Sequence, residues 1–171
     1  MVDQAQHDFV LAATFGGNGG AVRIAAESGA VIVFQTALRF NRLPEVEELE
    51  LGVNIMITDP WRSVTYRNRP MSAADFASLY RFLQSAMQEL HPEISVPAFD
   101  SASAGVILSV ATSSELDIEL DVTVVQYQGE PEPDLDHTRV QVARAALWEP
   151  ADIAKAIAET FGPELDQIAG S

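Results

Sequence analysis

Apolar and polar residues alternate along two long segments of this 171-residue chain. In residues 45–58 the apolar side chains fall mostly at odd positions, and in residues 115–128 mostly at even positions. Because successive side chains of a strand point to opposite faces, this period of two predicts strands with one buried face. Asp59-Pro60 ends the first segment, and Trp61 to Asn68 returns beside it as the partner strand of a hairpin.

Shorter β-prone runs occupy much of the remaining chain. Two of them, Val22–Ala26 and Val31–Leu38, are separated by Ser28-Gly29, which predicts a second hairpin. The Gly16–Gly20 cluster lacks the Lys of a phosphate-binding loop and the helix that would follow it, so we expect a hairpin loop there. The other predicted strands are Phe9–Phe15, a run that begins near Ile94, Gly105–Thr112 and Thr138–Trp148.

Two segments have the period of an amphipathic helix. Ser72 to Asp75 forms a variant of the capping box, which marks a helix N-terminus. The apolar residues that follow at helical spacing are Phe76, Leu79, Tyr80, Leu83, Met87 and Leu90. His91-Pro92 should end this helix, and a second helix should begin at Pro150 and end at Gly162-Pro163.

These elements predict a single α+β domain over residues 1–171, in which residues 1–8 form a frayed tail. We expect an antiparallel sheet built from hairpins, with the two amphipathic helices packed mainly on one of its faces. The apolar face of each helix must be covered, and a sheet rich in Val, Ile and Leu provides the cover.

Charge and composition exclude several classes of protein. The chain has 25 acidic and 10 basic residues, a net charge of −15, and it would repel nucleic acid and anionic membranes. It has no cysteine, which excludes disulfides, thiolate catalysis and cysteine zinc sites. No signal peptide or membrane-spanning run is visible, and a cytoplasmic location is expected.

No pattern in the sequence predicts catalysis, a cofactor or a metal site. The histidines, His7, His91 and His137, lack a second ligand at metal-binding spacing. The acidic residues Glu130, Glu132, Asp134 and Asp136 lack the glycine and final glutamate of a calcium loop. We expect them to lie in a solvated loop that two prolines keep extended. An enzyme is the weakest hypothesis, and a concave pocket with convergent polar groups would favour it.

Two acidic groups are the candidate binding residues. The first comprises Glu45, Glu47, Glu48 and Glu50, and the second comprises Asp117, Glu119 and Asp121 on the outer face of a predicted strand. One interpretation is that these charges keep the sheet soluble. The other is that they form an anionic docking face for a basic partner. Trp61, Tyr66 and Trp148 are expected to be core residues rather than contact anchors.

The order of elements from Glu45 onward resembles the WapI-type immunity protein family. The segments that carry the resemblance are Val46–Thr58, Ser72–Leu90, Ile118–Val124 and Trp148–Phe161. Members of that family are taken to neutralise a toxin domain made by the same cell. The resemblance implies a binding protein rather than an enzyme.

We therefore expect an acidic, non-enzymatic immunity protein that occludes the cleft of a basic toxin domain, such as a nuclease. It would act as a monomer or a small homo-oligomer. The alternative is a structural or adaptor subunit of a larger bacterial assembly, which stable homo-oligomers would favour.

Overall fold

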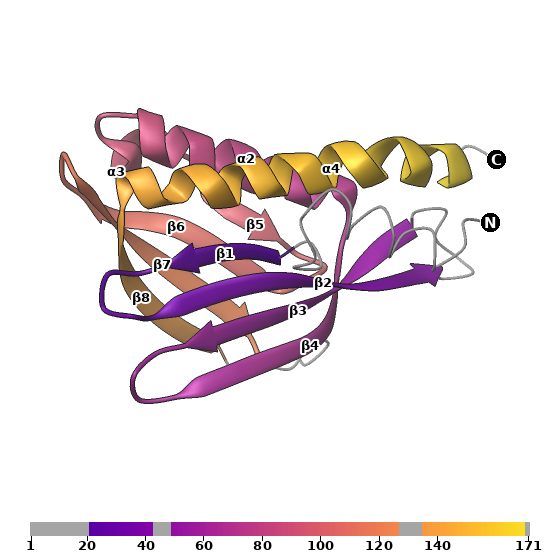
Figure 1. Cartoon of the computed structure of the whole chain (residues 1–171), viewed down its shortest axis with the longest axis horizontal. Helices are drawn as coiled ribbons and strands as arrows, with labels where there is room; N and C mark the ends of the chain where they lie inside the picture. The colour runs from indigo at the N-terminus through magenta and orange to yellow at the C-terminus, as the bar shows by residue number, and fades with distance from the viewer. Residues whose placement is uncertain (1–20, 43–48, 127–134, 170–171) are drawn as a thin grey trace.

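The computed structural model describes residues 21–42, 49–126 and 135–169 (Figure 1). Within these residues the strands form two four-stranded sheets, ordered β1-β2-β3-β4 and β5-β6-β7-β8. All neighbouring strands are antiparallel and strand order follows chain order, so each sheet is a meander. The predicted α+β class is confirmed. The tail at residues 1–8, the Phe9–Phe15 strand and the Gly16–Gly20 loop lie outside the described residues.

The first sheet contains the hairpins predicted at Ser28-Gly29 and at Asp59-Pro60. Its strands are β1 (Ala21–Ala25), β2 (Val31–Arg42), β3 (Leu49–Thr58) and β4 (Ser63–Met71). Gly29, between β1 and β2, has a φ of 91°, which residues with a side chain rarely adopt. Between β3 and β4, the Asp59 carboxylate accepts hydrogen bonds from the backbone N–H groups of Trp61 and Arg62 at 2.8 and 2.9 Å.

A β-bulge in β4 changes which side chains face the interior. Ile55 pairs with Tyr66 and Val53 with Arg69, so two residues of β4 lie opposite Asn54. In a regular strand, residues three apart point to opposite faces. The extra residue restores Tyr66 and Arg69 to the same side, and both are buried.

The second sheet contains β5 (Phe99–Ser101), β6 (Val106–Ser113), β7 (Asp117–Val125) and β8 (Leu135–Ala143). Three predictions about its strands are wrong. The strand expected over Thr138–Trp148 spans Leu135–Ala143 instead, and a 3₁₀ helix follows it at Arg144–Leu147. The run expected near Ile94 is a short helix, because Pro92 favours the first turn of a helix, and β5 begins only at Phe99. Leu116, an even-numbered apolar residue of the alternating segment 115–128, should face inward by this pattern, but it is exposed in the turn between β6 and β7, where Ser114 and Asp117 exchange hydrogen bonds.

The helices of the described residues are α2 (Ala73–Gln88), α3 (Pro92–Ser95), the 3₁₀ helix η1 (Arg144–Leu147) and α4 (Trp148–Ala169). The capping box of α2 is confirmed, since Ser72 and Asp75 each accept a hydrogen bond from the other's backbone N–H. Leu90 lies beyond the end of α2 and is exposed, contrary to the prediction. Helix α4 continues past Gly162-Pro163, because a proline removes one backbone hydrogen bond without necessarily ending a helix.

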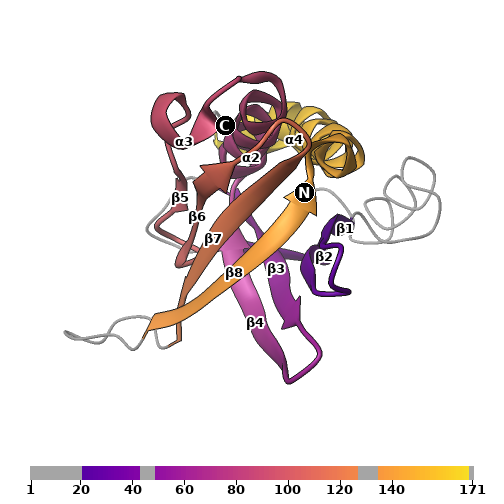
Figure 2. The same cartoon turned by 90° about the vertical axis from the view of Figure 1, so that its left-hand side faces the viewer.

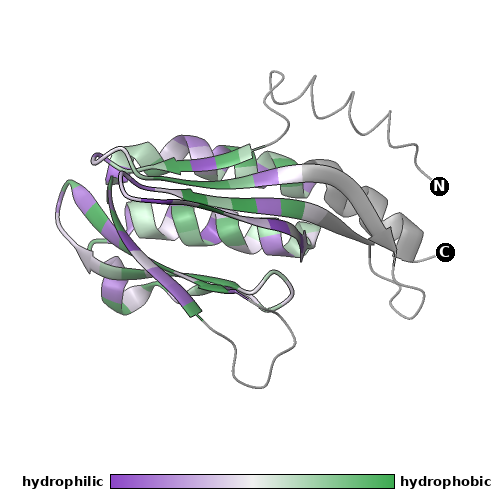
Figure 3. Ribbon diagram, turned by 90° about the horizontal axis from the view of Figure 1, so that it is seen from below, coloured by the Kyte–Doolittle hydropathy of each residue, from purple (hydrophilic) through white to green (hydrophobic). Residues whose placement is uncertain are grey.

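The helices α2 and α4 lie side by side along one side of the molecule (Figure 1). Figure 2 shows the two sheets below them, inclined to each other. Hydrophobic and hydrophilic residues alternate along the strands, as Figure 3 shows. Buried residues from both sheets and from the helices α2 and α4 form a single hydrophobic cluster.

The eight strands in the described part of the chain form two sheets rather than the one sheet we expected. Two helices can cover only part of the apolar face of a single eight-stranded sheet, so the rest of that face would be exposed to water. Two sheets that face each other bury their inner faces together, and the helices close the remaining side. No helix within the described residues is long and apolar enough to cross a membrane.

Candidate partner-binding site

The first predicted acidic group lies largely outside the described residues, which omit Glu45, Glu47 and Glu48. Glu50 belongs to β3, where its backbone pairs with Asn41 of β2. The structure therefore places only the second group, Asp117, Glu119 and Asp121, which we call the β7 acidic row.

The β7 acidic row lies on the outward face of β7, as predicted. The residues between and beyond its members, Ile118, Leu120 and Val122, are fully buried. Each acidic side chain is half-buried, because neighbouring strands flank β7 on both edges. Strand alternation alone accounts for this arrangement.

Side chains of β8 contact Glu119 and Asp121 of the row. Arg139 pairs with Asp121 across the two strands, and its Nε donates to Asp121 Oδ1 at 2.6 Å. Its Nη1 lies 3.6 Å from Glu119 Oε1, and His137 Nε2 lies 3.1 Å from Asp121 Oδ1. These partners depend on the register of β8 against β7, which local sequence patterns do not specify.

The Asp117 end of the row has a different electrostatic environment. Repulsion from Asp117, followed by a side-chain hydrogen bond with Asp117 and by slight desolvation, raises the pKa of Glu27, although Glu27 is exposed. Glu27 is held there because its backbone N–H donates to Gln141 O of β8 at 3.3 Å. Among the described residues, no cation lies within ion-pair distance of Glu27 or Asp117. This end of the row carries uncompensated negative charge.

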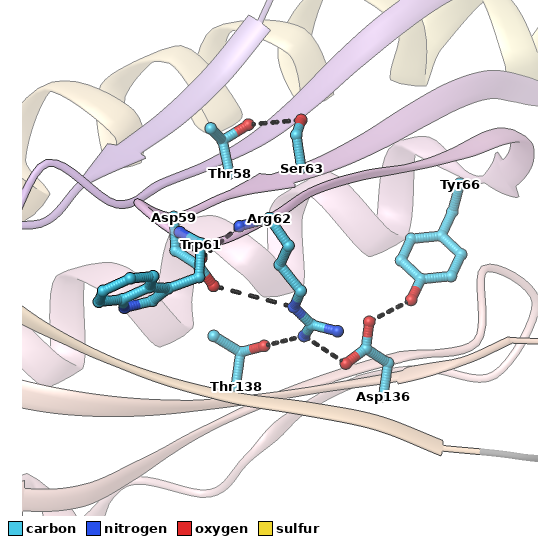
Figure 4. Close-up of polar contacts among 8 residues, drawn as sticks. All are labelled: Thr58, Asp59, Trp61, Arg62, Ser63, Tyr66, Asp136 and Thr138. Atoms are coloured by element: carbon cyan, nitrogen blue, oxygen red, sulfur yellow. Dashed lines mark hydrogen bonds and ion pairs between the residues drawn. The ribbon is translucent and has the colours of Figure 1, made fainter.

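A second polar cluster, which the sequence did not predict, joins the two sheets (Figure 4). Asp136 was expected in a solvated loop, but it is the second residue of β8 and only 6% exposed. Tyr66 donates its hydroxyl hydrogen to Asp136 Oδ2 at 2.5 Å, and Arg62 Nη2 donates to Oδ1 at 2.6 Å. Arg62 also reaches Thr138 Oγ1 at 3.0 Å and lies 3.8 Å from Asp59.

These contacts shift the ionisation of the cluster. Burial alone would raise the pKa of Asp136, but the hydrogen bonds from Tyr66 and Arg62, with the charge of Arg62, lower it below its usual value. Burial and the bond to Asp136 raise the pKa of Tyr66 to about 12. Asp136 is therefore a stably ionised link between the sheets, and the cluster has a structural role.

Arg69 extends this link along β4. Its guanidinium donates to Ala104 O at 3.3 Å and Gln126 O at 2.9 Å, and lies 5.3 Å from the centre of the Tyr66 ring. Burial lowers the pKa of Arg69. The first acceptor lies between β5 and β6 and the second directly follows β7, so Arg69 also joins the first sheet to the second.

The three aromatic residues singled out from the sequence have different environments. Tyr66 is buried, which confirms the core prediction, but Trp61 and Trp148 are exposed and the prediction is wrong for both. Trp61 lies in the turn between β3 and β4, outside the strand that was predicted to contain it. Trp148 begins α4 at the surface.

Within the described ranges, no group of three or more His, Cys, Asp or Glu residues is placed to hold a metal ion. Of the acidic loop residues, Glu130, Glu132 and Asp134 lie outside those ranges. Comparison with protein-family models, with curated proteins and with solved structures gives no match.

Proposed function

We propose that this protein is a non-enzymatic binding protein that neutralises a basic protein partner, in the manner of an immunity protein. The carrying observation is the outward-facing acidic row of β7, whose Asp117 end has no cation from the described residues within ion-pair distance and has Glu27, bonded through its backbone to β8, beside it. Repulsion between Glu27 and Asp117 disfavours the fully ionised free protein, and a Lys or Arg side chain from a partner would relieve it.

The net charge of −15 supports the same proposal over a longer range. A basic domain would be steered toward this surface, and the effect would weaken as salt screens the charges. A toxin that acts on nucleic acid needs a cationic cleft, and an anionic surface can occupy such a cleft in place of phosphates. The resemblance to immunity proteins favours this class of partner.

The test is co-expression with the C-terminal domain encoded by the open reading frame immediately upstream. We expect a basic domain that stops growth when expressed alone and is tolerated when this chain is present. Replacing Asp117, Glu119 and Asp121 by their amides should weaken the protection. A neighbouring product without net positive charge, or growth arrest that this chain does not relieve, would contradict the proposal.

A second candidate function, an adaptor subunit of a larger assembly, is favoured by the positions of the two tryptophans. Trp61 is next to Arg62, which contacts the start of β8, and Trp148 follows the end of the same strand. A nine-residue strand spans about 30 Å, so the exposed indoles lie far apart and could contact different partners. Stable homo-oligomers of the purified protein would favour this function, and a monomer would favour the inhibitor.

A further inference from the structure

Four exposed apolar side chains gather at one end of the molecule. They are Leu90, Ile94, Leu116 and Trp148, with exposed fractions of 75, 83, 74 and 62%. They come from the segment after α2, from α3, from the turn between β6 and β7, and from the start of α4. Figure 1 shows these four segments at the same end of the fold. We call this surface the apolar end.

Arg144 holds most of these segments together. Its guanidinium donates to Glu89 O at 2.6 Å, Leu90 O at 3.2 Å and Ser114 O at 2.8 Å. Its backbone N–H donates to Leu116 O at 2.9 Å. A hydrogen bond from Ser113 to Glu93 attaches α3 to the end of β6. The apolar end is therefore a fixed surface rather than a set of unrelated loops.

Each apolar residue of this surface has a glutamate as its neighbour in the chain. The four pairs are Glu89-Leu90, Glu93-Ile94, Glu115-Leu116 and Trp148-Glu149. Glu89, Glu115 and Glu149 are exposed. Within residues 89–95, 114–117 and 144–149, the basic residues are His91, which lies 3.5 Å from Glu93, and Arg144, which carbonyl groups surround. The apolar end therefore has an acidic rim.

We infer that the apolar end docks a protein segment whose apolar side chains are flanked by Lys or Arg. Apolar contacts at the centre of an interface supply most of its affinity, and charged residues around them set the choice of partner. The acidic rim would repel a second copy of this chain and attract a basic segment. Asp117 adjoins Leu116, so the apolar end continues into the β7 acidic row. The inference rests on the proposed function and adds the contact surface and the chemistry of the partner.

The probe is a designed amphipathic helix of Leu and Lys, compared with the same helix carrying Glu in place of Lys. The chain has two tryptophans, so Trp61→Phe leaves Trp148 as the fluorescent reporter. We expect the emission of Trp148 to shift to shorter wavelength when the Leu-Lys helix binds. Ile94→Asp and Leu116→Asp should each weaken the binding about tenfold or more.

Leu135→Asp is the matched control. Leu135 is an exposed residue of the same sheet, at the start of β8 and away from the apolar end. It should leave the affinity for the Leu-Lys helix unchanged. If Leu116→Asp and Leu135→Asp have equal effects, or if the Leu-Lys helix does not bind, the inference is overturned.

The same measurements separate this inference from the proposed function. Binding that depends on the β7 acidic row but not on Ile94 or Leu116 would overturn the docking surface and leave the charge-based function standing. Equal binding of the Leu-Lys and Leu-Glu helices would contradict the role of charge in both. Self-association that Leu116→Asp abolishes would assign the surface to a second copy of this chain and overturn the inference.

Discussion

Tyr66 of β4 and Asp136 of β8 share a hydrogen bond of 2.5 Å although 70 residues separate them in the chain. The bond joins the two sheets, and Arg62 completes it by donating to the other carboxylate oxygen. Because both oxygens of a buried carboxylate are satisfied, the charge of Asp136 is tolerated in the interior. The cluster should therefore contribute measurably to stability.

Replacing Tyr66 by Phe removes only the hydroxyl group and leaves Asp136 with one hydrogen bond fewer. We expect the free energy of unfolding to fall by about 1–3 kcal/mol, measured by urea denaturation. Tyr80→Phe is the control, since the Tyr80 hydroxyl forms no hydrogen bond with a described residue. If both variants lose the same stability, the bond to Asp136 contributes nothing specific.

Alkaline pH should weaken the same link. The pKa of Tyr66 is raised from 10.0 to about 12 in the folded protein, so its stabilising effect is complete below pH 10 and is lost as the pH rises through 12. The absorbance of tyrosinate should show a component that titrates near pH 12. This component should be missing from Tyr66→Phe, and its persistence there would rule out the assignment.

Arg144 should stabilise the end of α2. Its guanidinium donates to the carbonyl groups of Met87 and Glu89, and the last turn of α2 has no basic residue of its own. Arg144→Ala should lower the free energy of unfolding by about 1–2 kcal/mol. Arg81→Ala, at an exposed position of α2 without such bonds, should change it by less than about 0.5 kcal/mol. If Arg144→Ala and Arg81→Ala lower the free energy of unfolding equally, Arg144 has no specific stabilising effect on the end of α2.

Arg139 should restrain binding rather than support folding. It is exposed and forms surface ion pairs, so Arg139→Gln should change the free energy of unfolding by less than about 1 kcal/mol. The same change removes the guanidinium charge beside Glu119 and Asp121 and should speed association with a basic partner in low salt. Arg23→Gln removes an equal charge from the first sheet, and an identical acceleration there would show that only net charge matters.

Gly29 should tolerate Asn better than Ala. Its φ of 91° strains residues with a side chain, although an added Cβ would meet no atom within 4 Å. Gly29→Ala should lower the free energy of unfolding by about 1 kcal/mol through backbone strain alone. Gly29→Asn should lower it less, since Asn adopts positive φ more readily. Thermal unfolding of the two variants provides the comparison. A loss in Gly29→Asn equal to or larger than that in Gly29→Ala would contradict the backbone explanation.

Local signals in the sequence predicted the elements that depend on neighbouring residues. The hairpin at Asp59 and the capping box at Ser72 each arise within a few residues, and the structure contains both. Alternation along β7 likewise predicted which side chains face outward. Ends of elements were less predictable, as the exposed Leu90 and Leu116 show, because a residue just beyond an element keeps its apolar character without being buried.

The candidate site depended more on contacts between distant residues. Nothing near Asp136 in the sequence indicates that Tyr66 and Arg62 will contact it, so it was assigned to a solvated loop. The pairing of Asp121 with Arg139 needed the strand register, and the contact between Glu27 and Asp117 needed the two sheets to meet.

The sequence alone determined the antiparallel hairpins, the amphipathic helices and the acidic character of the surface, because these follow from local spacing and composition. Only the tertiary structure decided that the strands divide into two sheets, that Asp136 is buried, and that four segments with exposed apolar side chains lie at the same end of the fold. Burial is a property of the assembled fold: a side chain loses its water only when distant segments pack over it.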